Sequence, residues 1–103
     1  MPDDVAATVV KNIVGAFPEV ERVILFGSRA RGDARQDSDW DFLVIMPSAL
    51  RPVARGVSVR RVARVPGIPM DFLVRTPEEV REGFPFFADD IAREGRLLYE
   101  RPR

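Results

Sequence analysis

Three aspartates, at positions 39, 41 and 71, have the residue type and the setting that metal-assisted chemistry needs. Asp39 and Asp41 open a stretch, 39–46, that alternates and then becomes continuously apolar, which is the pattern of a buried strand. Residues two apart on a strand face the same side, so both carboxylates can converge on a cation across about 6.5 Å of backbone. A solvated strand end is the alternative interpretation of this pair.

Asp71 lies in a second apolar run, 69–74, where a lone carboxylate needs a positively charged partner. If this strand lies beside 39–46, three carboxylates line one pocket and can bind one or two Mg²⁺ ions, which prefer oxygen ligands and substrate phosphates. Asp71 is then the candidate to draw a proton from an acceptor hydroxyl, or to hold the metal that does so. A salt bridge to one of the many arginines is the alternative.

A glycine and a serine, Gly27 and Ser28, follow a short apolar run, 20–26, that is rich in β-branched residues. Gly27 would let the backbone approach a ligand closely, because it has no Cβ. Ser28 is the predicted N-cap of a short helix whose free N–H groups suit phosphate oxygens, with Arg29 and Arg31 as cationic helpers. An ordinary strand, turn and capped helix would have the same local pattern.

Composition narrows the chemistry that these residues could support. The chain has 103 residues with 16 basic and 16 acidic side chains, so its net charge is zero. It has no cysteine and no histidine, which excludes thiolate nucleophiles, cysteine metal sites and a histidine base. Catalysis would therefore rest on carboxylates, arginines, hydroxyls and hard metal ions. The balanced charge does not favour a nucleic-acid partner, and no apolar run is long enough to span a membrane.

The predicted elements place the three acids on neighbouring strands of one domain, 1–103. Helices are expected over 5–17, 28–34, 48–64, from Thr76 onward and over 86–94, with strands over 20–26, 39–46, 70–74 and 96–100. Strand 39–46 should be central, since its end is apolar on both faces. The predicted fold is α/β (α+β): a small mixed β-sheet with helices mainly on one face.

Gly27-Ser28, ten intervening residues, then Asp39-Trp40-Asp41 and a later strand aspartate at Asp71 together resemble the nucleotidyltransferase superfamily of the DNA polymerase β type. The sequence Gly-Ser-Arg-Ala-Arg-Gly at 27–32 and the shortness of the chain resemble the minimal (MNT) members of this superfamily. The resemblance implies a polymerase β-like palm fold. It also implies that Gly27 and Ser28 hold the triphosphate, that Asp39 and Asp41 bind the metals, and that Asp71 completes the site.

Members of this size are often encoded beside a HEPN-domain toxin, and several adenylylate a tyrosine of that toxin as its antitoxin. The resemblance thus implies an enzyme that transfers AMP from ATP to a hydroxyl of a HEPN partner protein, in a homo- or hetero-oligomer. The first residues have no basic and apolar leader pattern, so a cytoplasmic location is expected. The Arg51–Arg64 segment and the Phe84–Phe87 patch are candidate contact surfaces, with a solvated face and a core plug as the alternative interpretations. Two alternatives remain: a non-catalytic antitoxin that masks its partner, and an aminoglycoside-type transferase that acts on a small molecule.

Overall fold

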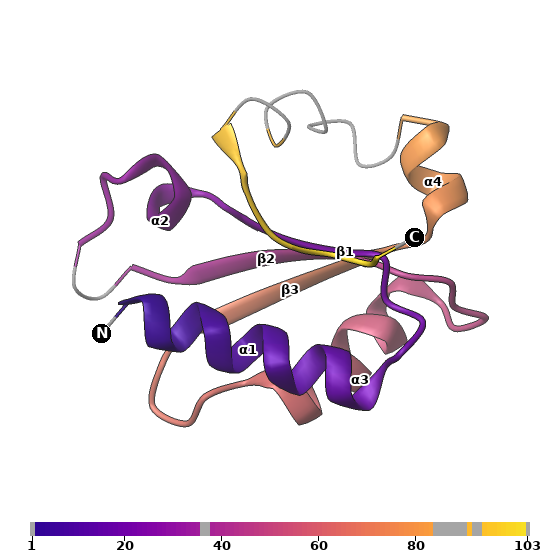
Figure 1. Cartoon of the computed structure of the whole chain (residues 1–103), viewed down its shortest axis with the longest axis horizontal. Helices are drawn as coiled ribbons and strands as arrows, with labels where there is room; N and C mark the ends of the chain where they lie inside the picture. Colours follow the sequence, from indigo (N-terminus) through magenta and orange to yellow (C-terminus); the bar gives the residue numbers. More distant parts are fainter. Residues whose placement is uncertain (1, 36–37, 84–90, 92–93, 103) are drawn as a thin grey trace.

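The computed structural model describes residues 2–35, 38–83, 91 and 94–102. Within these residues, four strands form one sheet and four helices pack around it (Figure 1). The elements follow in the order α1 (Pro2–Ala16), β1 (Arg22–Phe26), α2 (Ser28–Arg31), β2 (Trp40–Ile45), α3 (Pro52–Ala63), β3 (Met70–Arg75), α4 (Pro77–Arg81) and β4 (Arg96–Glu100).

The sheet is mixed and has the strand order β3-β2-β1-β4. β1 is antiparallel to both β2 and β4, whereas β2 and β3 are parallel and are joined by a crossover through α3. Strand β2 lies inside the sheet and β3 lies at its edge, which confirms that the apolar run after Asp39 is an interior strand.

The two long helices cover one face of this sheet, as Figure 1 shows for α1 and α3. The main core lies beneath them, where Val9 and Ile13 of α1 and Val59 of α3 are fully buried with Phe42. Alternation along β2 sends Leu43 and Ile45 to the other face, into a smaller apolar cluster. The predicted mixed sheet with its main helices on one face is therefore confirmed.

A partly buried ion pair joins α3 to α4 and explains one arginine of the arginine-rich helix. Arg55 is 7% exposed and donates to Glu79 Oε1 at 2.7 Å and to the Leu50 carbonyl at 2.7 Å. Glu79 also accepts from the N–H of Thr76, whose hydroxyl accepts from the N–H of Glu79. This capping box confirms the helix start predicted at Thr76.

Several predicted boundaries were wrong. The third helix begins at Pro52 and not at residue 48, because proline suits a first helical position, and α2 ends at Arg31 because Gly32 turns left-handed (φ 85°). α1 begins at Pro2, before the predicted capping aspartates.

The helix predicted over 86–94 and the Phe84–Phe87 patch lie almost wholly outside the described residues. Across the parts that the structure describes, no helix is long and apolar enough to cross a membrane.

Candidate active site

The turn between β1 and α2 depends on glycine at position 27. Gly27 has φ 75° and ψ −160°, a region that essentially only glycine occupies. A Cβ built there would collide with Oδ2 of Asp41. Since Phe26 at the end of β1 pairs with Asp41 on β2, the glycine backbone lies directly against the Asp41 carboxylate.

Ser28 is the first residue of α2 and not its N-cap, so the capping prediction for its hydroxyl was wrong. Gly27 occupies the cap position, no side chain caps the helix, and the Gly27 carbonyl accepts from the N–H groups of Ala30 and Arg31. The N–H of Ser28 comes before the first N–H that has an acceptor within the helix, so a ligand can bind it. A helix of a single turn has a small dipole, so this N–H group and nearby arginine charge would have to bind a phosphate.

The parallel pairing of β2 and β3 brings two of the three predicted acids together. Asp41 is the register partner of Asp71, so the two residues lie side by side across one inter-strand spacing. The pKa of Asp41 is raised, first by partial burial and then by the negative charges of Asp71 and Asp39, while Arg31 acts to lower it. The structure thus crowds negative charge at the β2–β3 boundary, next to Gly27.

Asp39 and Asp71 are exposed and Asp41 is half-buried. Among the described residues, no three acidic side chains already form a group close enough to hold a metal ion. The donor chemistry nevertheless fits Mg²⁺, because these carboxylates supply only oxygen ligands and their mutual repulsion favours a cation. The exposed side chains of Asp39 and Asp71 can rotate toward Asp41, whose backbone is held between β1 and β3.

The two predicted phosphate-binding arginines lie on different sides of the sheet. Arg31 acts electrostatically on Asp41 and forms ion pairs with Asp33 at 3.3 Å and Glu94 at 3.7 Å. Arg29 instead places its guanidinium 4.8 Å from the centre of the Trp40 ring. Arg31 therefore lies on the carboxylate side, and Arg29 on the opposite side.

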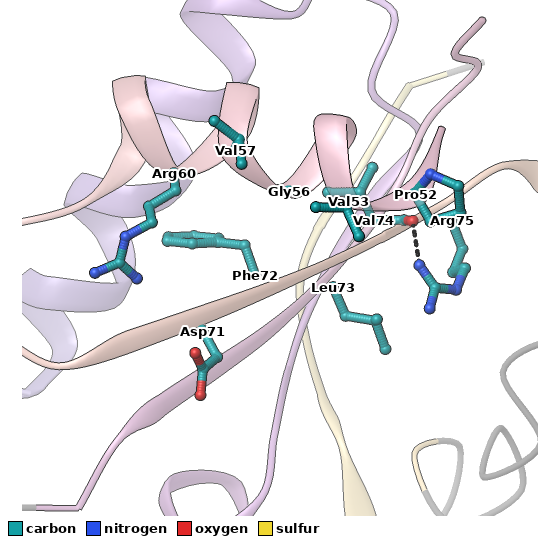
Figure 2. Close-up of a pocket in the computed structure, with 10 residues that line it drawn as sticks. All are labelled: Pro52, Val53, Gly56, Val57, Arg60, Asp71, Phe72, Leu73, Val74 and Arg75. Atoms are coloured by element: carbon teal, nitrogen blue, oxygen red, sulfur yellow. Dashed lines mark hydrogen bonds between the residues drawn. The ribbon is translucent and has the colours of Figure 1, made fainter. Parts of the chain in front are cut away.

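A cavity of 350 Å³ runs along the free edge of β3 and includes Asp71 (Figure 2). Figure 2 shows α3 above the strand, with Val53 and Val57 beside the opening and Asp71 pointing away from the helix. Gly56 lets α3 approach the strand, since a Cβ there would be 3.2 Å from the Phe72 carbonyl oxygen. The cavity thus connects an apolar surface of α3 with the acidic end of β3.

The sequence alone did not assign a role to Trp40 or Gly56. Trp40 stands between two aspartates and is the only tryptophan, a signal that could have singled it out. Nothing in the local pattern distinguishes Gly56 from a residue that merely weakens a helix, because its close neighbour Phe72 is distant in sequence.

The chain belongs to the nucleotidyltransferase domain family, whose model matches residues 8–98. This match agrees with the mixed sheet and its helices.

Among curated proteins, the chain is similar to the protein adenylyltransferase MntA of Aphanizomenon flos-aquae (strain 2012/KM1/D3), with 30% identity over 91 residues. The match covers 84% of this chain and 61% of the relative, so the chain spans about three fifths of the length of that protein.

Solved structures share the fold. A protein of Sulfolobus solfataricus, provisionally named a nucleotidyltransferase, is 28% identical with a TM-score of 0.70, and the match covers 95% of this chain and 79% of that one. The complex of a tri-AMPylated Shewanella oneidensis HEPN toxin with its MNT antitoxin gives a TM-score of 0.65 at 16% identity, covering 98% of this chain and 74% of that one.

Proposed function

We propose that this chain is a magnesium-dependent nucleotidyltransferase that transfers AMP from ATP to a hydroxyl of a partner protein. The observation that carries the proposal is the register of Asp41 with Asp71, directly beside the turn at Gly27. The similarity to a protein adenylyltransferase supports AMP as the transferred group. The likeness to the MNT antitoxin bound to its AMPylated toxin points to a HEPN-type toxin as the acceptor.

In this proposal, the turn residues hold the triphosphate. Gly27 permits close approach of the backbone, Ser28 supplies its N–H and hydroxyl, and Arg31 adds positive charge on the carboxylate side. The carboxylates of Asp39, Asp41 and Asp71 would hold one or two Mg²⁺ ions, which would neutralise charge on the phosphates and the departing pyrophosphate.

Asp71 is the proposed base because it lies at the edge of the sheet, where an acceptor can approach. The acceptor hydroxyl loses its proton toward Asp71 as its oxygen bonds to the α-phosphorus of ATP. The bond from that phosphorus to the bridging oxygen of pyrophosphate breaks, and pyrophosphate leaves with the bonding electrons. The products are an AMP ester of the acceptor and pyrophosphate.

The acceptor side would be formed largely by another molecule. The cavity beside Asp71 lies between the exposed Val53 and Val57 of α3 and the β3 edge, an opening along one side of the sheet. The segment from 48 to 64 carries five arginines and no acidic residue, so its exposed positions beside the cavity would favour an acidic and apolar polypeptide. The edge carbonyls of Met70 and Val74 already accept from Arg60 and Arg75, so side chains would contribute more to recognition than strand addition.

The direct test is co-expression of this chain with the protein encoded beside its gene, followed by intact-mass and peptide mass spectrometry. We expect an added AMP on a hydroxyl side chain of that protein, and its loss in the Asp39→Ala/Asp41→Ala variant. The complex should still form with the variant. If the partner stays unmodified, and the variant neutralises it as effectively as the parent chain does, then the function is stoichiometric masking and not catalysis.

A further inference from the structure

Arg29 connects the turn after β1 with the entry to β2. Its Nη2 donates to the carbonyl oxygen of Ser38 at 3.0 Å, and its guanidinium lies 4.8 Å from the centre of the Trp40 ring. Ser38 and Trp40 flank Asp39, so one side chain contacts the residues before and after an acid of the candidate site. A charged donor and a cation–π contact are each stronger when partly desolvated, and Arg29 is half-buried.

The contact lies on the face of the sheet opposite to the carboxylates. Trp40 and Asp41 are consecutive on β2, so their side chains point to opposite faces. Trp40 is 5% exposed and belongs to the core beneath α1, and with Arg29 it lines a 170 Å³ hollow that also includes Ala6 of α1 and Leu25 of β1. A guanidinium in this place is directed away from the Asp41–Asp71 pair.

We propose that Arg29 is a positioning residue, which holds the Gly27–Gly32 turn at a fixed distance from the Asp39–Asp41 segment. This inference rests on the proposed function, because the turn would bind the triphosphate and the aspartates would bind the cations. A cation held by the aspartates would reach the triphosphate only if this separation were kept. Arg29 thus acts through Ser38 and Trp40, and it does not contact phosphate.

The test compares nucleotide affinity with and without the cation, so it needs no acceptor. Binding of α,β-methylene-ATP to the full chain is measured by calorimetry, in EDTA and in Mg²⁺. For Arg29→Gln we expect the affinity in EDTA to stay within about twofold, and the gain in affinity due to Mg²⁺ to fall by about tenfold or more, because misplaced groups lose the bridging geometry. Arg31→Gln is the matched control on the same helix, and it should weaken binding under both conditions.

Equal weakening of both affinities by Arg29→Gln would overturn the proposal, because that is the behaviour of a phosphate ligand. An unchanged magnesium-dependent gain would also overturn it. A second readout uses Trp40, the only tryptophan. Its emission should shift when Mg²⁺ and the analogue bind to the parent chain, and this shift should be lost in Arg29→Gln.

Failure of the proposed function gives a different result. If the parent chain does not bind the analogue in Mg²⁺, then the nucleotidyltransferase proposal fails. The contact itself is then decided by a double-mutant cycle of unfolding free energies between Arg29→Gln and Trp40→Phe. If the two substitutions have non-additive effects on the unfolding free energy, then Arg29 does link the turn to β2. If their effects are additive, then this role of Arg29 is refuted.

Discussion

Gly27→Ala should separate the function of the turn from its stability. The backbone at position 27 has φ 75° and ψ −160°, which costs a residue with a Cβ about 1–3 kcal/mol. The new methyl group would also meet the end of the Asp41 side chain. Because that carboxylate can swing aside, the collision adds little to the loss of stability, but it displaces the acid that the candidate site depends on.

Gly67→Ala is the matched control for the backbone cost. Gly67 has φ 83°, and a Cβ there meets no atom within 4 Å. Its substitution should cost about 1–2 kcal/mol through the left-handed backbone alone. In a domain of about this size each kcal/mol lowers Tm by about 4–8 °C, so thermal melts can compare the two variants.

The two variants should therefore lose similar stability, within about 1 kcal/mol, and differ in magnesium-dependent ATP binding. Gly67→Ala should retain the affinity of the parent chain, and Gly27→Ala should lose most of it. Calorimetry at a temperature where both variants are folded provides the measurement. A Gly27→Ala protein with undiminished magnesium-dependent affinity would refute the argument that glycine makes room for the Asp41 carboxylate.

Three further outcomes are expected. Burial opposes the charge of Glu79, but hydrogen bonds from Thr76 and Arg55 and the charges of Arg55 and Arg75 outweigh it and lower the pKa below its ordinary value of 4.5. The folded-state pKa of Glu79 is thus below the unfolded one, so the stabilisation by its carboxylate is present above pH 4.5 and is lost as the pH falls through the folded value. In urea melts over a range of pH, Glu79→Gln should therefore lose less stability in acid than the parent chain does. Arg55→Leu should cost about 3 kcal/mol in the same melts, since it breaks a pair whose arginine side chain is 8% exposed; a loss near zero would contradict a stabilising pair. Val57→Asp, at the cavity, should reduce AMP transfer to the partner protein and spare ATP binding, whereas Val62→Asp on the same helix should leave both intact; equal effects would count against the cavity as the acceptor side.

The sequence was sufficient to predict the strands of the sheet, because periodicity and boundary residues are local signals. The apolar run after Asp39 requires an interior strand, and Thr76 with Glu79 requires a helix start; both are present. Boundaries failed where one residue decides them, as at Ser28, because the φ of Gly27 made the glycine the cap. From the sequence, Asp41 and Asp71 were expected to meet only if their strands paired. That pairing depends on the tertiary structure, so local patterns could not predict it.

The different positions of Arg29 and Arg31 show what pattern reasoning lacked. Both precede the acids and both carry the charge that a triphosphate attracts, so composition treats them alike. Their difference follows from β2, where alternation sends Trp40 into the core and Asp41 to the other face. Once Trp40 is buried beneath α1, its ring offers Arg29 a partner on that side, and Arg31 is left to interact with Asp41. An aromatic residue between two acids therefore helps to predict the roles of the arginines before it. Its side chain marks the face of the strand that packs in the core, and the acids mark the face that carries the candidate site.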